Sequence, residues 1–188
     1  MTPRLLLLAT VLSAYATPLP VKSVSLQGRL IALSETPLES VAHTWGVAVR
    51  SKGDAGDALR WSCLRLAGEP SRVLLLQSSE IDGGLVGTVD LHTAGEQPLL
   101  ETSCQSTTLA PSDIVTDRGL RAGLSRDSVV RLLGLPTRDS AGVSIYHAET
   151  PQTNRTDGRS GFVEYSTLIV VFTDGHVRQF RADYRVIN

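Results

Sequence analysis

The stretch Gly119-Leu-Arg-Ala-Gly-Leu-Ser-Arg-Asp-Ser-Val-Val-Arg-Leu-Leu-Gly-Leu-Pro136 predicts a short helix whose two ends are both encoded in the sequence. Ser125 can accept a hydrogen bond from an otherwise unpaired amide of the first helical turn. Gly134 can adopt the positive φ that ends many helices, and Pro136 prevents continuation. The helix between these signals has only about two to three turns.

A helix of this length needs a partner surface, because it is not stable alone in water. Val129, Leu132 and Leu133 occur at the i, i+3, i+4 spacing, which places them on one apolar face. The β-rich segments that follow can supply the surface against which this face packs. We therefore expect an α+β fold with a short helix packed on an antiparallel sheet.

Length and composition are those of a globular protein. The 188 residues are enough for one ordinary domain or two small units. Hydrophobic residues make up 41% and charged residues 20%, so the chain can bury a core. The formal net charge of −1 gives no long-range attraction to nucleic acid or to an anionic membrane. We expect no nucleic-acid partner.

The N-terminus has the pattern of a secretory signal peptide. Arg4 supplies the positive charge, Leu5 to Leu12 the apolar core, and Ala14-Tyr15-Ala16 the small-x-small cleavage pattern. We expect residues 1–16 to be removed and the mature protein to be periplasmic or secreted. The apolar run is too short for a membrane span, and no cysteine closely follows the cleavage site. Neither a membrane span nor a lipid anchor is therefore expected in the mature chain.

The two cysteines predict one structural disulfide. Cys63 and Cys104 are the only cysteines in the sequence, and an even number in an exported chain is typical of a disulfide. No Cys-x-x-Cys motif is present, so a redox role is not favoured.

Residues 17–104 predict a first helix-plus-sheet unit. Thr36 as N-cap, Pro37 at the first helical position and Glu39 three residues after the cap match a capping box. Gly46 can end this helix. The strands are expected at Val21–Leu33, from Leu59 to Cys63, and at Arg72–Ser79, Leu85–His92 and Leu99–Cys104.

Residues 105–116 are interpreted as a connector, and residues 117–188 as a second unit of one helix and a hairpin. A strand is expected at Val143–Ala148, followed by a polar loop at 149–161. Two β-rich runs at 162–173 and 176–186 are joined by Asp174-Gly175, a strong hairpin signal. A two-residue turn would place the following side chains opposite each other: Thr173 and His176, Ile169 and Phe180, Thr167 and Ala182, Tyr165 and Tyr184.

The two units follow the same order. The segment from Thr36 to Gly46 and the segment from Ser125 to Gly134 each read as cap, short helix and glycine, and β-rich runs follow both. Two readings stay open: a tandem repeat of one αβ unit, or a single α+β domain with unrelated halves.

The C-terminal unit resembles a known family. The glycine-rich lead-in from Gly119, the capped helix, the Leu133-Gly-Leu-Pro136 end and Val171-Phe-Thr-Asp-Gly-His-Val177 are similar to the outer-membrane assembly lipoproteins called SmpA/OmlA or BamE. The resemblance covers about residues 116–184. It implies a helix on a hairpin and a role in envelope assembly. The broader relatives include β-lactamase inhibitor proteins, which carry this unit twice with disulfides. No lipid-bearing cysteine is present, which is a departure from BamE.

Motifs for catalysis, cofactors or metals are weak or absent. The sequence has no Gly-x-Ser-x-Gly, no phosphate-binding loop and no His-Glu-x-x-His. Asp90 with His92, His147 with Glu149, and Asp174 with His176 are spaced to share a strand face, while His43 lies on the first expected helix. We expect no catalytic, cofactor-binding or metal-binding residues, and no enzyme. A site built on His92, His147 or His176 remains the competing hypothesis.

A partner-binding surface is the favoured hypothesis. Arg and Tyr are enriched at interface hot spots, and the candidates are Tyr146, Tyr165, Arg178, Arg181 and Tyr184. By strand parity Arg181 shares a face with Arg185, whereas Arg178 shares the other face with Tyr184. The competing reading is that these arginines are solvated strand residues. We expect an exported, non-catalytic protein-binding or envelope-assembly module that binds another envelope or secreted protein. The alternative is an inhibitor of a secreted or periplasmic enzyme.

Overall fold

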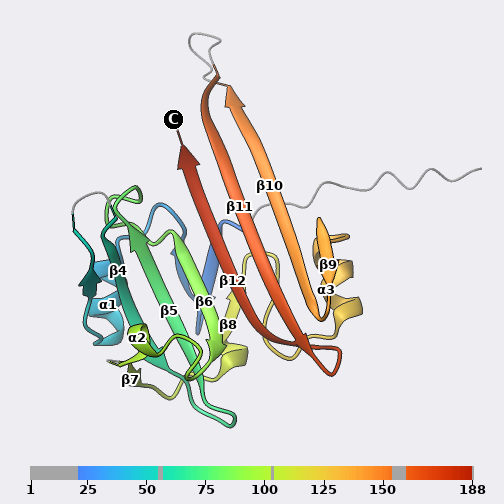
Figure 1. Ribbon diagram of the computed structural model, residues 1–188, viewed down its shortest axis with the longest axis horizontal. Coiled ribbons are helices and arrows are strands. Elements are labelled where there is room, and N and C mark those ends of the chain that lie inside the picture. Colours follow the sequence, from blue (N-terminus) through green and yellow to red (C-terminus); the bar gives the residue numbers. More distant parts are fainter. Residues whose placement is uncertain (1–20, 55–56, 103, 154–159, 188) are drawn as a thin grey trace, which may run out of the picture.

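The computed structural model describes residues 21–54, 57–102, 104–153 and 160–187. The expected signal peptide, residues 1–16, lies outside these ranges. Most of the described chain forms one large, mainly antiparallel sheet (Figure 1). Its strands follow the order β3 (Arg50–Lys52), β4 (Leu59–Arg65), β5 (Arg72–Ser79), β6 (Thr88–Thr93), β12 (His176–Ile187), β11 (Ser160–Thr173), β10 (Val143–Thr153) and β9 (Arg138–Ser140), and β7 (Gln105–Ser106) pairs with β4.

A smaller sheet and three short α-helices complete the described fold. The small sheet has the order β2 (Arg29–Ala32), β1 (Ser23–Leu26) and β8 (Ile114–Thr116). The helices are α1 (Leu38–Trp45), α2 (Pro98–Glu101) and α3 (Arg126–Leu133), with a 3-10 turn at Pro111–Asp113. These elements confirm an antiparallel, sheet-rich fold with a short helix packed on the sheet. Within the described ranges, no helix is both long and apolar enough to cross a membrane.

The main core lies on one face of the large sheet. It joins Leu74, Leu76, Val89 and Leu91 of the sheet with Leu26 of the small sheet, and it also includes apolar residues of α1 and α3. A second, smaller cluster lies on the opposite face and consists of Trp61, Cys63, Val73 and Leu75. The large sheet is therefore covered on both faces along β4 and β5.

Helix α3 begins as the sequence predicts. The Ser125 hydroxyl accepts a hydrogen bond from the Ser128 amide at 3.3 Å. Val129 is 0% exposed and Leu133 8% exposed, so both are buried in the main core. Leu132, however, is 46% exposed, and its assignment to the buried face is wrong. The contact with the sheet is narrow, so the i, i+4 pair occupies it and the residue between them lies at its edge.

Helix α1 ends as predicted but does not begin as predicted. Gly46 has a φ of 64° and closes the helix in the left-handed conformation. Thr36 is not the N-cap, because its hydroxyl accepts a hydrogen bond from the Ala32 amide at 2.9 Å. Pro37 occupies the cap position without a side-chain hydrogen bond. The hydroxyl is thus used to fix the turn after β2 rather than the helix.

Two expected strands and the expected connector are corrected by the structure. The segment 21–33 is a hairpin with a turn at Gln27-Gly28, where both residues have positive φ. The expected strand at Leu99–Cys104 is wrong, because residues 99–101 belong to the short helix α2, which begins at Pro98. The connector 105–116 contributes β7 and β8, and β8 pairs with β1. Local β propensity cannot reveal which of these segments finds a strand to pair with.

The β11–β12 hairpin has the predicted turn and an unpredicted bulge. Asp174 and Gly175 have φ values of 50° and 73°, and Thr173 lies opposite His176. The register shifts between Val171 and Phe172, so the predicted pairs beyond it are wrong by one residue. The observed pairs are Ile169 with Arg181, Thr167 with Asp183, Tyr165 with Arg185, Val170 with Phe180, Leu168 with Ala182 and Ser166 with Tyr184.

The predicted units 17–104 and 117–188 share one sheet. β6 of the first unit pairs antiparallel with β12 of the second, from Leu91 opposite Phe180 to Thr88 opposite Asp183. Figure 1 shows that β10, β11 and β12 extend well past the ends of β5 and β6. The three long strands β10, β11 and β12, which we call the ribbon, are therefore joined to the shorter strands β4, β5 and β6 through four residue pairs between β12 and β6.

Candidate functional site

No segment among the described residues covers one face of the long ribbon β10–β11–β12, whereas the same face of β4 and β5 is covered. Seven of the residues that face away from the main core on β10, β11 and β12 are half-buried, and we call them the open sheet face: Val143, Ile145, Tyr165, Ile169, Val171, Gln179 and Arg181. His147 and Glu149, on the same face of β10, are exposed. On the same face of β4 and β5, Trp61, Cys63, Val73 and Leu75 are all buried. On this one face of the sheet, the apolar side chains of β4 and β5 are thus shielded from solvent, whereas those of the ribbon are shielded only in part.

The cover over β4 and β5 is fixed by a covalent bond. Residues 94–102 and Cys104, which we call the cover segment and which include α2, lie over this part of the sheet, and Leu100 packs against the small cluster. The predicted disulfide between Cys63 and Cys104 is present. The Trp61 indole N–H donates a hydrogen bond to the Leu100 carbonyl at 3.0 Å. The cover segment is therefore attached to β4 at two neighbouring points.

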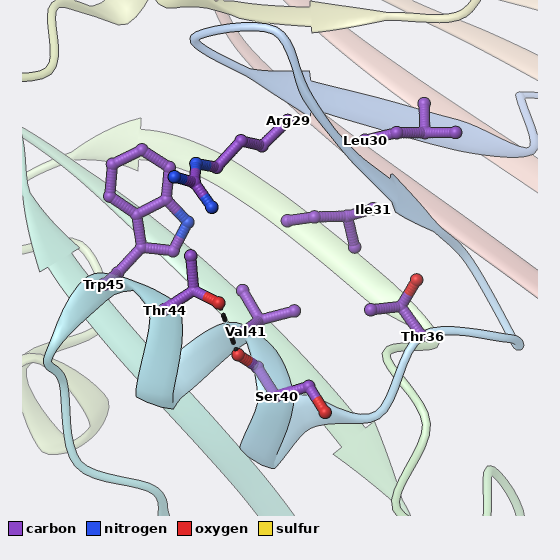
Figure 2. Close-up of a pocket in the computed structure, with 8 residues that line it drawn as sticks. All are labelled: Arg29, Leu30, Ile31, Thr36, Ser40, Val41, Thr44 and Trp45. Atoms are coloured by element: carbon purple, nitrogen blue, oxygen red, sulfur yellow. Dashed lines mark hydrogen bonds between the residues drawn. The ribbon is translucent and has the colours of Figure 1, made fainter.

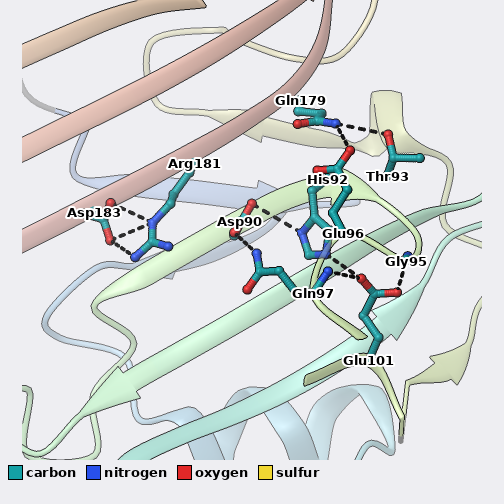
Figure 3. Close-up of polar contacts among 10 residues, drawn as sticks. All are labelled: Asp90, His92, Thr93, Gly95, Glu96, Gln97, Glu101, Gln179, Arg181 and Asp183. Atoms are coloured by element: carbon teal, nitrogen blue, oxygen red, sulfur yellow. Dashed lines mark hydrogen bonds and ion pairs between the residues drawn. The ribbon is translucent and has the colours of Figure 1, made fainter. Parts of the chain in front are cut away.

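A buried histidine forms a third attachment (Figure 3). His92 on β6 is 2% exposed, and its Nε2 lies 3.1 Å from Glu101 Oε1 on α2. Its Nδ1 lies 3.4 Å from Asp90 Oδ1, on the same strand face as the sequence predicts. Burial acts to lower the pKa of His92, but the Asp90 and Glu101 carboxylates outweigh it and raise that pKa.

Glu101 is held in its charged form by several donors. The backbone amides of Gly95 and Gln97 donate to its carboxylate at 2.7 and 2.9 Å. Burial acts to raise the pKa of Glu101, but these amides and His92 lower it below its ordinary value. His92 and Glu101 therefore stabilise each other's charged form across the contact between β6 and α2.

The network continues to the open sheet face. The Gln97 side-chain amide donates to Asp90 at 2.7 Å, and Asp90 lies directly opposite Arg181 in the β6–β12 ladder. Arg181 also donates to both oxygens of Asp183. Between the cover segment and the ribbon is a hollow of about 160 Å³, whose walls include Gln97, Ile169, Val171 and Arg181. The cover segment thus forms one wall of a shallow hollow on the open sheet face.

The candidate partner-binding residues are only partly brought together. Tyr165 and Arg181 lie on the open sheet face, and Arg178 is half-buried. Tyr146 is 4% exposed and Tyr184 5% exposed, so these two rings belong to the main core and are removed from the predicted surface. Their positions on β10 and β12 put them on the same face as Phe180 and Ala182. Tyrosine is chemically suited to either location, so residue type alone did not separate them.

The sequence-based hypothesis missed the apolar part of this surface. Ile145, Ile169 and Val171 lie on the open sheet face, next to core residues such as Val170 on the same strand. The continuous Leu168-Ile-Val-Val171 run carried a usable signal, because an antiparallel strand with one solvated face usually alternates apolar and polar residues. Apolar residues at consecutive positions indicate a strand with two apolar faces.

The histidines do not form a shared centre. His147 Nδ1 lies 3.2 Å from the Thr167 hydroxyl, His176 Nδ1 lies 2.9 Å from the Asp174 carbonyl, and His43 is exposed on α1. Among the residues whose placement is described, no group of three His, Cys, Asp or Glu side chains could hold a metal ion.

A second hollow lies on the other side of the molecule, between β2 and α1 (Figure 2). It has a volume of about 170 Å³. Ile31 and Val41 are buried at its floor, and Trp45 is half-buried at one end. Arg29, Ser40 and Thr44 line its exposed rim. This groove combines an apolar floor with a cationic end.

The chain was compared with protein-family models, curated proteins and solved structures, and none of them matches it.

Proposed function

We propose that the protein is an exported, non-catalytic protein-binding module that engages another envelope or secreted protein through the open sheet face. The observation that carries the proposal is the contrast within one sheet face. Trp61, Val73 and Leu75 are buried beneath a cover segment, whereas Ile145, Ile169 and Val171 on the ribbon are only half-buried. Apolar side chains gathered around a few polar groups are characteristic of protein-binding surfaces.

Polar groups at the same place can give such an interface its specificity. Arg181 is half-exposed, with a side-chain exposure of 39%, and its guanidinium group is oriented by Asp183. Gln97 and Gln179 present amides beside Ile169 and Val171. Arginines with a fixed orientation lose little freedom on binding, and they are common at interface hot spots. Tyr165 lies on the same face and adds an aromatic ring.

The disulfide supports the exported part of the proposal, because disulfides persist in oxidising compartments. The N-terminal residues supply the signal-peptide pattern. Edman sequencing of the protein purified from its natural host should begin at Thr17. A mature chain that begins at Met1 would contradict export by a cleaved signal peptide.

A tandem αβ repeat is the architecture we propose for this module. The order α1, β3, β4, β5, β6 recurs as α3, β9, β10, β11, β12, and the two sets meet at their last strands. The role in envelope assembly rests only on the likeness of residues 116–184 to the SmpA/OmlA or BamE family. The alternative of an enzyme inhibitor uses the same open sheet face, and the partner's identity distinguishes the two.

The test is site-specific photo-crosslinking in cells that naturally produce the protein. A benzophenone side chain in place of Tyr165, on the same face of β11 as Ile169, should give a discrete adduct, and one at Arg131 on the exposed side of α3 should give none. Ile169→Glu should abolish recovery of the crosslinked partner, whereas Leu132→Glu, which also adds a carboxylate at an apolar surface position, should not. Equal recovery with both variants would refute the assignment of the open sheet face.

The inhibitor alternative is tested with the recovered partner. If the partner is an enzyme, the purified protein should reduce its turnover and the Ile169→Glu variant should not. If turnover is unchanged by saturating protein, the inhibitor alternative is excluded and the assembly or binding role remains.

A further inference from the structure

The outer edge of β2 has one free backbone position. The Leu33 amide donates to the Lys22 carbonyl at 2.8 Å, so by alternation Leu33, Ile31 and Arg29 direct their backbone groups towards β1. Leu30 and Ala32 therefore direct theirs outward. The Ala32 amide and carbonyl are already bonded to Thr36. The Leu30 amide and carbonyl have no such partner among the described residues, so they are available to another strand.

The groove beside this edge has a matching side-chain pattern. Arg29 and Ile31 flank Leu30 and place their side chains in the hollow between β2 and α1. Val41 of α1 lies at the floor of the hollow and Trp45 at one end, and Figure 2 draws the Arg29 guanidinium group and the Trp45 ring at the same end. A strand beside β2 would lie along this hollow and place alternate side chains in it.

Arg29 has no counterion among the described residues. Its side chain is exposed, and no hydrogen bond or ion pair connects it with any described residue. Glu39, which lies in the first turn of α1, is paired with Arg60 instead. An acidic side chain of a bound segment would therefore meet an unpaired charge, while an apolar side chain would meet Ile31, Val41 and Trp45.

We propose that the groove between β2 and α1 binds an extended segment of a partner protein by antiparallel strand addition. The segment's central residue pairs with Leu30 and exchanges two backbone hydrogen bonds with it. Its neighbours direct their side chains into the groove, so an apolar residue lies opposite Ile31 and an acidic residue opposite Arg29. Because the strands run antiparallel, the recognised pattern reads apolar-x-Asp/Glu from the N-terminus. This surface is separate from the open sheet face, on the other side of the large sheet.

The test starts from a phage library of random octapeptides selected against the purified protein. Enriched sequences should share the apolar-x-Asp/Glu pattern. The affinity of a labelled synthetic peptide with this pattern for the purified protein can then be measured by fluorescence anisotropy. Arg29→Glu should weaken binding about tenfold, and replacing the peptide's acidic residue by lysine should restore it in that variant. Arg121→Glu, an exposed charge reversal elsewhere, should leave binding unchanged.

Methylated peptides test the backbone contact. N-methylation of the central residue should weaken binding more than tenfold, because it removes the donor to the Leu30 carbonyl. N-methylation of the next residue, whose amide faces away from β2, should have little effect. In nuclear magnetic resonance spectra the Leu30 amide and the Trp45 indole should shift on titration with the peptide.

Four outcomes would overturn the proposal. Selection could return no common pattern, or Arg29→Glu could leave peptide affinity unchanged. Alternatively, sedimentation could show that the protein self-associates through this groove and that Arg29→Glu makes it monomeric, in which case the occupant is a second copy. Loss of peptide binding in Ile169→Glu but not in Arg29→Glu would assign the peptide to the open sheet face instead.

Discussion

Two adjacent leucines of α3 provide a controlled test of how the fold is held together. Leu133 is 8% exposed and Leu132 46% exposed. Changing either one to alanine removes the same three carbon atoms from the same helix, so the change in helix propensity is nearly the same. At about 0.8 kcal/mol for each buried carbon, Leu133 loses about 2 kcal/mol of transfer free energy. The cavity left in the core brings the expected cost of Leu133→Ala to about 3 kcal/mol.

Leu132→Ala should cost about 1 kcal/mol, because roughly half of that side chain is already in water and solvent fills the space left behind. The free energy of unfolding of both variants can be measured by urea titration, followed by circular dichroism and by the fluorescence of the buried Trp61. A difference of about 2 kcal/mol is expected. Equal losses, or a larger loss in Leu132→Ala, would refute the placement of α3 and with it the packing of the helix on the ribbon.

Three further predictions concern the cover segment and the cap of α3. Replacing Cys63 and Cys104 together by serine should lower the free energy of unfolding by about 4 kcal/mol in urea titrations, because the bond links residues 41 positions apart; a loss below about 1 kcal/mol would contradict this estimate. His92 has a raised pKa in the folded protein, so its contribution is complete below about pH 6.5 and is lost as pH rises through the folded pKa. Urea midpoints from pH 5 to 9 should therefore fall more in the wild type than in His92→Gln, and parallel profiles would argue against a charged His92. Ser125→Ala should cost about 1 kcal/mol by the same assay, and a neutral result would mean that the cap hydrogen bond is replaced by water.

The same network predicts an acid limit for the cover segment. Glu101 has a lowered pKa in the folded protein, so its contribution is present above its ordinary pKa of about 4.3 and is lost as pH falls through the folded value. The attachment of α2 to β6 is therefore strongest from about pH 4.3 to 6.5, where both charges are fully stabilised. At lower pH Glu101 loses its charge, and at higher pH His92 does.

Much of the local structure is determined by nearby residues in the sequence. The Ser125 cap, the left-handed Gly46 and the Asp174-Gly175 turn each depend on contacts within a few residues, and all three occur as predicted. The disulfide followed from the cysteine count. The error at Thr36 is also local, because two neighbouring turns compete for one hydroxyl.

The placement of the open sheet face was decided by contacts distant in sequence. Beyond the bulge beside Val171, each β12 residue is one position away from its predicted partner on β11, and a shift by one position moves a side chain to the other face of the sheet. Ile169 therefore lies opposite Arg181 and not Phe180. Tyr146 and Tyr184 have the residue type of a surface hot spot, yet they are buried because their strand faces meet the core.

The sequence by itself determined the Ser125 cap, the Gly46 helix end and the Asp174-Gly175 turn, since each requires only one or two residue types at a short spacing. It also determined the disulfide, because only two cysteines are present. The tertiary structure alone decided that β6 pairs with β12, and that the cover segment lies over β4 and β5 while no described segment covers the ribbon. The reason is that strand propensity marks a segment as suited to pairing without specifying its neighbour. The neighbour is selected by the apolar area that the whole arrangement buries.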